Sequence, residues 1–518
     1  MTVTGKQAAG LGWMVILAGL AVGYGLCGGA WRVGIDDGWE LGKIQFAVQH
    51  PHLLQRVWND QPWLHTLLNA ALCRWLGEGP WLPRLFTVVS VAAMWGAVAW
   101  MGGPHLRFVG MLTAALLWAG SFNVLSMGFS VMLEAPAWAW GVVSAGLLYR
   151  ATGTPSWRWV GLSGALMAAA LHLKLTAALV APGLALLCWR QYGWQGALRL
   201  LGPWCIGFCA VFVGVAWLSP SFRWEWLLGS HWAARAGARG DAVFGAMSAP
   251  LLGTDHLPLL IGGALGLVAV ARTGWPPVGV FALGVLGGAF LFKAVAYPWW
   301  LYYEYHFAVP LSVLGGLAMA WAVQALRGHW LRHQDPSQED PPKAGLCHER
   351  SLPAWVAVWM VAALAAFGVG FGSSAPYALW AHVRVGGRQL DPVFLPHLQQ
   401  AAGRVQWCYS TPHHFPELAH CRILPPPELL ILPRKRFWSG QISWLEVTQY
   451  LDDYGVELLI LQREVELAQP LFVAWLTNRY DFVTRHHSWE LWQRKSGGEA
   501  DGLPGAQPAP ALEGGGDL

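Results

Sequence analysis

Long runs of apolar residues constrain this chain more than any other feature of its sequence. They approach the roughly 20 residues that a helix needs to cross the hydrocarbon core of a bilayer. Backbone polar groups in lipid must be paired within the chain, so such runs form helices. The clear runs are 11–30, 86–100, 108–127, 135–149, 203–218, 257–271, 278–296, 307–325 and 353–371. The sequence therefore predicts a polytopic α-helical membrane protein.

One further stretch, residues 159–189, is too long for a single span and is interrupted by His172 and Lys174. We interpret it as two short spans, which together with the runs above makes about eleven transmembrane helices. The composition agrees, because only 12% of the residues are charged, about half the usual share in soluble domains. Much of the protein surface therefore does not meet water.

The distribution of positive charge indicates the orientation, because short cytoplasmic loops are enriched in Lys and Arg. Lys6 precedes the first run, Arg190 and Arg199 flank one short loop, and Arg327 and Arg350 bound the loop before the last run. These positions agree only if the N-terminus lies inside. With an odd number of spans the C-terminal part lies outside, so we expect a multi-pass protein of the cytoplasmic (inner) membrane.

Two external loops are long enough to carry a site. The first covers residues 31–83 and the second covers residues 220–256. In the first loop, residues 63–76 place apolar side chains at helical spacing, directly after Asp60-Gln61-Pro62, which is a typical helix start. We expect an amphipathic helix that lies on the membrane surface.

The composition changes near Ser373, where polar residues return. We therefore divide the chain into a transmembrane glycosyltransferase-like domain over 1–372, a small external α/β domain over 373–495 and a disordered tail over 496–518, which is rich in Gly, Pro and Ala. The expected elements of the external domain are a helix over 444–454, a buried strand over 458–461, a helix near 467–480 and a strand near 488–493.

Cys408 and Cys421 share this external domain, where a disulfide is chemically permitted. Spacing alone does not decide between a disulfide and two thiols. The other cysteines lie mostly in apolar runs, where they serve as small packing residues. No Cys/His spacing typical of a zinc site occurs in the sequence.

The strongest chemical signal is the adjacent pair Asp36 and Asp37, just outside the first apolar run. Two neighbouring carboxylates repel each other, which favours a nearby cation or substrate. A general base facing a lipid-linked substrate would have such a position. Asp and Gly also favour turns, so the dipeptide alone fits a solvated turn as well.

Two charged residues stand in apolar surroundings. A lysine at the centre of a membrane helix costs about 3 kcal/mol, so Lys174 should face a polar cavity or extend to the interface. A buried carboxylate needs a partner or a proton, which applies to Glu134. Alternatively, Glu134 stabilises the N-terminus of a helix that starts near Pro136.

Further motifs follow in a fixed order along the chain. A Pro-containing segment (61–65) opens the amphipathic helix, a Gly-containing turn follows (76–77), and an Arg starts the second span (84–85). Later come an acidic residue before a Pro (132–136), a Lys near the end of a span (171–176) and a Tyr-rich segment before a Pro-containing span (302–310). With the Asp36-Asp37 pair, this order resembles the membrane glycosyltransferases of the C-type fold, particularly the protein O-mannosyltransferase and lipid A aminoarabinose transferase group.

The chain departs from that family at three positions. Trp63 stands where the family often has a second proline, and Glu134 stands where it usually has Asp. Of the aromatic pair that often follows the acidic pair, only Trp39 remains. These departures leave the donor and acceptor sugars open.

The resemblance implies transfer of a sugar from a polyprenyl-phosphate donor to a lipid, glycan or protein acceptor on the external face, with inversion at the anomeric carbon. Asp36 is then the best candidate for the base that deprotonates the acceptor. Asp37 would orient Asp36 or bind a cation, and Glu134 would hold the acceptor or support Asp36. No cofactor is implied, and a divalent cation stays open because relatives of this fold differ in metal dependence.

The leaving lipid phosphate needs positive or hydrogen-bonding groups to stabilise its developing charge. Lys174 is the leading candidate. Arg84, Tyr305 and His306 could also approach the phosphate, and His65 lies in the matching Pro-containing segment. For each of these residues a packing or interface role is an equally good explanation.

His231 and Arg235 are four residues apart in the second external loop, so a helix would place both on one face. We include His231 among the candidate substrate-binding residues. A solvated helix face explains the same spacing.

Two other classes of function compete with an enzyme. A transporter or flippase predicts paired repeats and broken helices with midplane charges, and the sequence contains no repeat. A non-catalytic envelope-binding protein would leave Asp36, Glu134 and Lys174 unexplained as a set. Besides a donor, an acceptor and membrane lipids, we expect no nucleic-acid partner, because no basic stripe with interleaved aromatic residues occurs.

Overall fold

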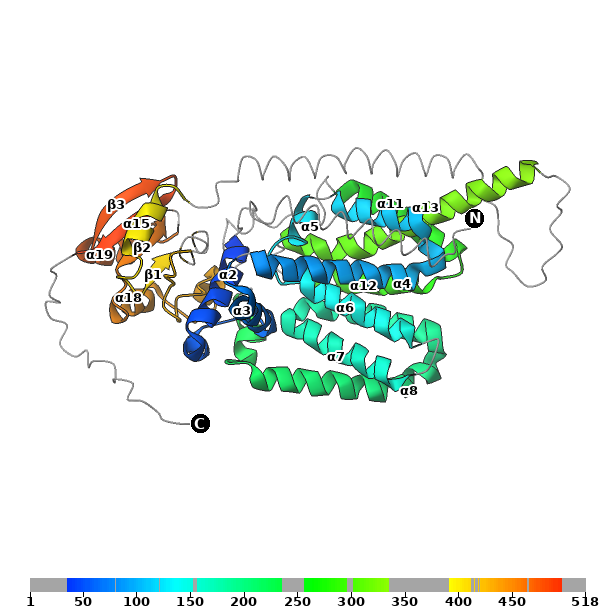
Figure 1. The fold of residues 1–518 in the computed structure, drawn as a ribbon, viewed down its shortest axis with the longest axis horizontal. Helices are drawn as coiled ribbons and strands as arrows, with labels where there is room; N and C mark the ends of the chain where they lie inside the picture. Colours follow the sequence, from blue (N-terminus) through cyan, green and yellow to red (C-terminus); the bar gives the residue numbers. More distant parts are fainter. Residues whose placement is uncertain are drawn as a thin grey trace.

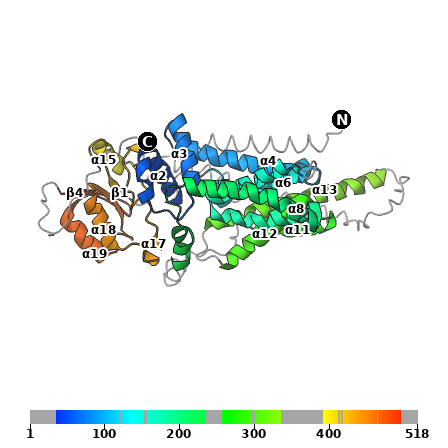
Figure 2. The ribbon, with the colours of Figure 1, turned by 90° about the horizontal axis from the view of Figure 1, so that it is seen from below.

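The computed structural model describes residues 35–79, 81–120, 122–151, 156–234, 256–295, 301–334, 391–410, 414, 418, 420–463 and 465–495. The predicted spans at 11–30 and 353–371 and the predicted tail over 496–518 lie outside these residues. Within them, a bundle of helices occupies one end of the molecule and a mixed sheet with short helices occupies the other (Figures 1 and 2). Helices α2 (Ile35–Gln49) and α3 (Leu64–Leu76) lie between the two.

Seven long helices form the bundle, and their bounds follow the apolar runs of the sequence closely. For example, the run at 135–149 becomes a helix over Glu134–Arg150. The described bundle helices are α4 (Trp81–Ala119), α6 (Glu134–Arg150), α7 (Trp157–Leu173), α8 (Ala181–Leu218), α11 (Leu257–Arg272), α12 (Pro277–Val295) and α13 (Tyr305–Gln334). Short elements connect them: η1 (Pro51–Arg56), α5 (Phe122–Met127), η2 (Leu175–Val180), η3 (Glu225–Gly229) and η5 (Leu301–Glu304).

Helices α4 and α8 are each interrupted by residues with non-helical backbone angles. In α8 the break is Gly193, whose φ of 66° is readily adopted only by glycine. Before the break, Tyr192 hydrogen-bonds to the carbonyl of Leu148 in α6. After the break, the backbone carbonyl oxygen of Phe212 lies 2.9 Å from Nε2 of His172 in α7, which is hydrogen-bonding distance. The two halves of α8 thus serve as separate helices on either side of a turn, as the apolar runs predicted.

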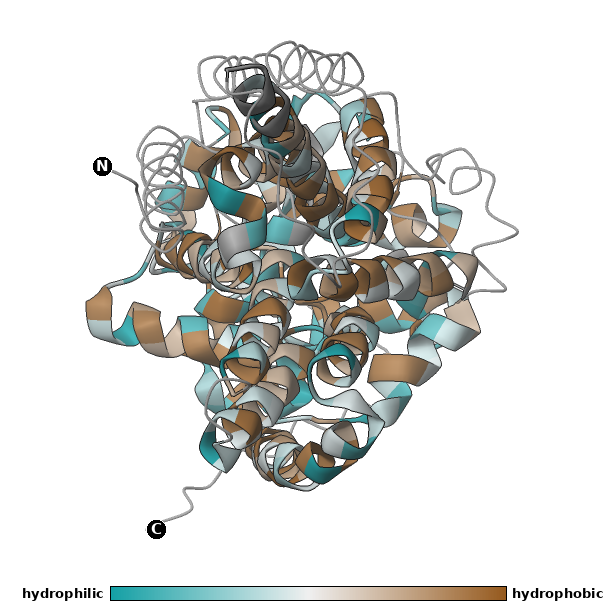
Figure 3. Cartoon of the chain, turned by 90° about the vertical axis from the view of Figure 1, so that its right-hand side faces the viewer, coloured by the Kyte–Doolittle hydropathy of each residue, from teal (hydrophilic) through white to brown (hydrophobic). Residues whose placement is uncertain are grey.

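Several helices are apolar and long enough to cross a membrane by length and composition. They are Trp81–Gly103, Leu175–Leu218, which includes the break at Gly193, Pro277–Ala294 and Tyr305–Arg327. Viewed from the end in Figure 3, the bundle helices are mostly hydrophobic. On α8 the apolar side chains of Ile206, Val213 and Trp217 point outward and are more than 60% exposed. An outward apolar surface of this kind is expected of a protein that contacts lipid, and the chain is a membrane protein.

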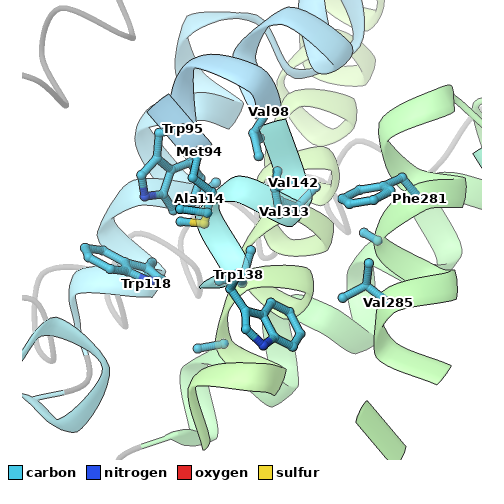
Figure 4. Packing of buried hydrophobic residues seen from close by; sticks show 14 of the residues in the cluster. Met94, Trp95, Val98, Ala114, Trp118, Trp138, Val142, Phe281, Val285 and Val313 are labelled. Carbon is cyan, nitrogen blue, oxygen red and sulfur yellow. The ribbon is translucent and has the colours of Figure 1, made fainter. Parts of the chain in front are cut away.

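The interior of the bundle is packed with tryptophan and aliphatic side chains. Trp95 and Trp118 meet edge to face, with ring centroids 6.0 Å apart. Trp138, Val313 and Phe281 belong to the same buried cluster, which Figure 4 shows, so α4, α6, α12 and α13 contribute to one core. Protein interiors are close-packed, so this core holds the ends of the bundle helices in fixed positions relative to one another.

The C-terminal part contains a four-stranded sheet in the order β1-β2-β4-β3. Strand β1 (Cys408–Ser410) is parallel to β2 (Leu458–Gln462), whereas β4 (Trp489–Arg494) is antiparallel to both β2 and β3 (Tyr480–His486). The surrounding helices are α15 (Phe394–Ala401), α17 (Arg434–Trp438), α18 (Trp444–Asp453) and α19 (Pro470–Arg479).

Several elements of this part were predicted from the sequence. Helix α18 and strands β2 and β4 lie where we expected them, and Ser443 and Glu446 form a capping box at the start of α18. The predicted helix over 467–480 is correct only in part, because Tyr480 already begins β3. Cys408 and Cys421 are both buried, and no disulfide joins them.

One apolar core joins the C-terminal sheet to the loop predicted over residues 31–83. It contains Phe46 of α2 and Trp58 and Trp63 of the following segment, together with Trp407 and Leu430 of the C-terminal part. The ring of Phe46 stacks on that of Trp407, with centroids 6.3 Å apart. The two regions, although far apart in sequence, are therefore packed together on one side of the bundle.

Candidate functional site

The acidic pair begins a helix rather than a turn. Residues Ile35–Gln49 form α2, so Asp36 lies in its first turn, although the structure describes only the backbone of Asp36. Asp37 is buried, and its Oδ1 accepts a hydrogen bond from the backbone N–H of Val131, at 3.0 Å. This bond ties the start of α2 to the segment that leads into α6. Asp37 therefore does not lie in a solvated turn, and that interpretation is wrong for this residue.

Most of the other predicted site residues gather at one end of the bundle. Arg84 lies in the first turn of α4, Glu134 is the first residue of α6, Lys174 directly follows α7 and Tyr305 is the first residue of α13. Aromatic contacts connect these ends: Phe86 of α4 meets the ring of Trp140 in α6 at 5.9 Å.

Glu134 and Lys174 form a buried ion pair. Glu134 is fully buried and Lys174 is 7% exposed. Lys174 has an extended backbone and separates α7 from η2, so the helix break allows its side chain to reach the start of α6. Lys174 points inward, so extension of its side chain to the interface does not apply. Glu134 lies in the first turn of α6, where a carboxylate also stabilises the N-terminus of the helix, as the alternative interpretation expected.

His306 and Tyr305 both contact Trp138, which lies one turn after Glu134 in α6. The ring of His306 stacks on that of Trp138, with centroids 4.9 Å apart and planes inclined by 9°. Tyr305 meets the edge of the same indole at 6.5 Å. The structure thus places Glu134, Lys174, Tyr305 and His306 at the same end of the bundle, and their roles in binding a substrate stay predictions.

A second polar group joins α2 to α3. The Nζ of Lys43 lies 2.7 Å from Glu40 Oε1 and 3.3 Å from Asn59 Oδ1. His65 Nδ1 lies 3.7 Å from Glu40 Oε2, and all four side chains are buried. Burial raises the pKa of Glu40, but the charge of Lys43 and the contact with His65 outweigh it and hold that pKa below its usual value. Glu40 is therefore a carboxylate at neutral pH.

Sequence reasoning missed Glu40, Lys43 and Asn59 as parts of the site. A signal was present, because residues 36, 40 and 43 are spaced by four and three and therefore share one face of a helix. That signal is visible only once residues 35–49 are known to be helical.

Asp60 has a different role from the predicted one. Helix α3 begins at Leu64 and has no side-chain cap. Instead, Asp60 forms an ion pair with Lys435 of α17, and its Oδ2 lies 3.1 Å from Nε2 of His231. Arg235, the predicted companion of His231, lies outside the described residues.

One further buried pair was not predicted. His256, just before α11, lies 3.3 Å from Glu304, which immediately precedes Tyr305. Both side chains are nearly inaccessible to solvent. Across the parts of the chain that the structure describes, no three His, Cys, Asp or Glu side chains are grouped as they would be around a metal ion.

Comparison with known proteins gives a likeness in fold. No protein-family model matches the sequence, and no curated protein matches it either. Among solved structures, the crystal structure of ArnT from Cupriavidus metallidurans in the apo state is similar, with a TM-score of 0.62 and 16% sequence identity over 93% of this chain and 98% of that chain. The structure of the same ArnT bound to undecaprenyl phosphate gives a TM-score of 0.61 with the same identity and coverage. The chain therefore has the C-type membrane glycosyltransferase fold, as the order of its motifs predicted.

Proposed function

We propose that this protein is a membrane glycosyltransferase that moves a sugar from a polyprenyl-phosphate donor to an acceptor on the extracytoplasmic face. The observation that carries the proposal is the buried Glu134–Lys174 pair, held at the helix ends where Asp37, Tyr305 and His306 also gather. A buried pair of charges is costly to build, and membrane proteins keep such groups mainly where they act. ArnT, which shares the fold, has been crystallised with undecaprenyl phosphate, and this supports a polyprenyl-phosphate donor.

In this proposal Asp36 is the base. Its carboxylate removes the proton from an acceptor hydroxyl or amine as the acceptor atom attacks the anomeric carbon of the donor. The bond between that carbon and the phosphate oxygen breaks, and polyprenyl phosphate leaves with the electron pair. Attack from the side opposite the phosphate inverts the anomeric carbon. The position of Asp36 in the first turn of α2 supports this role, because the Asp37–Val131 bond anchors that turn.

Lys174 stabilises the charge that develops on the leaving phosphate. Preorganised charges in a site that excludes water act strongly on a developing anion. Glu134 holds Lys174 in place, and its carboxylate balances the lysine charge when no donor is bound. Arg84, His65, His231, Tyr305 and His306 are proposed to contact the donor or acceptor around this pair.

The core shared by the first loop and the C-terminal sheet supports a proposal for the orientation of the protein. The first loop and the C-terminal sheet share one core, so they lie on one side of the membrane. That requires an even number of crossings between them, which the eleven expected spans satisfy because ten of them follow the first. Short loops rich in positive charge are expected inside. We therefore propose that the N-terminus is cytoplasmic and that residues 373–495 form an external domain.

A transfer assay tests this function. Purified wild-type protein and Asp36→Asn are incubated with a panel of radiolabelled polyprenyl-phosphate sugars in an extract of native lipids. Transfer by the wild type that the folded variant loses supports the enzyme and the base. Equal transfer by both proteins would remove Asp36 from the chemistry. Absence of transfer from every donor, with a usable acceptor present, would contradict the enzyme.

A further inference from the structure

The segment between η1 and α3 connects three regions that are distant in sequence. Trp58 donates from its indole N–H to Gln441 of the C-terminal part, at 2.9 Å, and the guanidinium of Arg436 lies 5.2 Å from the Trp58 ring centroid. Trp63 donates to Ser221 in the loop predicted over residues 220–256, at 3.0 Å. Residues 57–63, which we call the clamp segment, are therefore held from outside the transmembrane helices.

Asp60 lies at the centre of the clamp segment. Only 6% of its surface is exposed, its carboxylate pairs with Lys435, and its Oδ2 lies 3.1 Å from Nε2 of His231. A carboxylate withdrawn from water to this extent needs charged or hydrogen-bonding partners. Lys435 belongs to α17, so the positive charge that neutralises the buried Asp60 carboxylate comes from the C-terminal part.

The neighbouring residue extends this connection towards the acidic pair. Asn59 accepts a hydrogen bond from Lys43, and Lys43 pairs with Glu40. Glu40 lies one helical turn after Asp36 in α2. Gln61 links Asn59 to Asp60, because its side-chain amide donates to Asp60 Oδ2 and its backbone N–H donates to Asn59 Oδ1, each at 3.2 Å. A polar chain thus leads from Lys435 through Asp60, Gln61, Asn59 and Lys43 to Glu40, that is, from the C-terminal part to the helix that bears the proposed base.

We propose that Lys435 is a positioning residue for the proposed transfer reaction. By holding Asp60 it fixes the clamp segment, and the clamp segment fixes α2 through the Asn59–Lys43 hydrogen bond. The C-terminal part therefore sets the position of Asp36 relative to the Glu134–Lys174 pair rather than simply covering the site. The catalytic consequence rests on the proposed function, whereas the mechanical consequence does not.

A second ion pair between the same two regions provides a matched control. Arg56 pairs with Glu428 at 2.6 Å, but the arginine side chain is 53% exposed. Exposed pairs of this kind contribute little to stability. In the described part of the chain Arg56 contacts Glu428 and the ring of Tyr454, and both belong to the C-terminal part. Arg56→Ala removes an ionic contact between the regions and leaves the polar chain intact.

The kinetic test compares Lys435→Ala, Lys435→Arg and Arg56→Ala in the full-length protein. A displacement of about 1 Å at a reacting group can cost about a hundredfold in rate. We therefore expect Lys435→Ala to lower kcat ten- to a hundredfold, as an order of magnitude, with little change in KM for the donor. Lys435→Arg should recover most of kcat, and Arg56→Ala should stay within about twofold of the wild type. Wild-type kcat in Lys435→Ala, or an equal loss in Arg56→Ala, would overturn the proposal.

A structural readout separates the clamp from the enzymatic function. Amide hydrogen exchange of residues 35–49 and 57–63 should be faster in Lys435→Ala than in the wild type, and unchanged in Arg56→Ala. If that exchange pattern appears in a protein without transferase activity, the clamp stands and the proposed function fails. Unchanged exchange in α2 would contradict the clamp. If Lys435→Ala does not fold, Lys435→Met keeps the apolar stem and is subject to the same two outcomes.

Discussion

The Nζ of Lys174 binds Oε1 of Glu134, and this buried pair joins the break after α7 to the first turn of α6. Neither charge is compensated by solvent, because Glu134 is fully buried and Lys174 nearly so. The pair is also close to the stacked rings of Trp138 and His306. Its geometry fixes a cation at the end of the bundle that carries the other candidate site residues.

Removing one member of this pair should cost more stability than removing both. A stranded buried charge typically destabilises a protein by about 3–5 kcal/mol, whereas a well-packed neutral pair can be nearly neutral. We expect Glu134→Gln and Lys174→Met each to lower the thermal midpoint strongly, and the double variant to recover most of it. Thermal unfolding in detergent, followed by Trp fluorescence, measures this.

The same variants separate stability from chemistry. The double variant should remain inactive in sugar transfer although its folding has recovered, because the cation facing the phosphate is gone. A double variant that is both stable and active would remove the pair from the mechanism. Additive losses of stability would show that the two charges do not interact.

Asp37 should tolerate loss of its charge better than loss of its oxygen. Its Oδ1 accepts the N–H of Val131, and an asparagine can supply a carbonyl oxygen in the same place. Asp37→Asn is therefore expected to retain the fold of α2 and part of the transfer activity. Asp37→Ala leaves a buried N–H without that acceptor, at a cost of about 1–3 kcal/mol. The comparison needs thermal midpoints and transfer rates for both variants, and equal effects in both would contradict a positioning role.

The sequence predicted the helical bundle well because lipid imposes one simple rule on the chain. A run of apolar residues must be a helix, and the two polar residues His172 and Lys174 inside the run at 159–189 marked a real break, which the structure places at Lys174. The order of the weak motifs also predicted the fold. Each motif lies at or near the end of a helix, and the apolar runs determine where those helices end.

The loop over residues 31–83 was predicted less well because long-range contacts decide its structure. Gly34, Gly38 and two aspartates favour a turn locally, yet residues 35–49 form a helix that is buried against Val131 and the C-terminal core. Tertiary packing overrides local propensity in such cases. Asp60 is a similar case, because its partners His231 and Lys435 are remote in sequence. No local pattern could have assigned them to it.

The C-terminal part should lose stability in acid through Asp391. Burial raises the pKa of Asp391, but the contact with His486 and the N–H groups of Val393 and Phe394 outweigh burial and hold it below its usual value. A group whose pKa is lower in the folded state stabilises the fold above its unfolded pKa, which is about 4. That contribution is lost as the pH falls through the folded pKa.

The acid sensitivity can be measured without any activity assay. Hydrogen exchange of residues 394–401 in α15, followed between pH 6 and pH 3 and corrected for the intrinsic rate, should show loss of protection at the acidic end. Asp391→Asn should have lower protection at pH 6 and a flatter pH dependence. An identical pH profile in the wild type and the variant would exclude Asp391 as the cause.

Close contact between α7 and α8 depends on a glycine without a side chain. A Cβ at Gly164 would overlap the backbone carbonyl of Trp204, whereas a Cβ at Gly214, also in α8, would meet no atom within 4 Å. Small residues allow membrane helices to approach closely, and overpacking costs typically about 1–3 kcal/mol. Gly164→Ala should therefore lower the thermal midpoint in detergent, while Gly214→Ala should leave it unchanged or raise it slightly, since alanine favours helix more than glycine.

Gly164→Ala should also lose transfer activity in parallel. His172 follows Gly164 by two turns and precedes Lys174, so a shift of α7 would displace the Glu134–Lys174 ion pair. Equal midpoints for the two variants would show that α7 and α8 are not packed at this glycine.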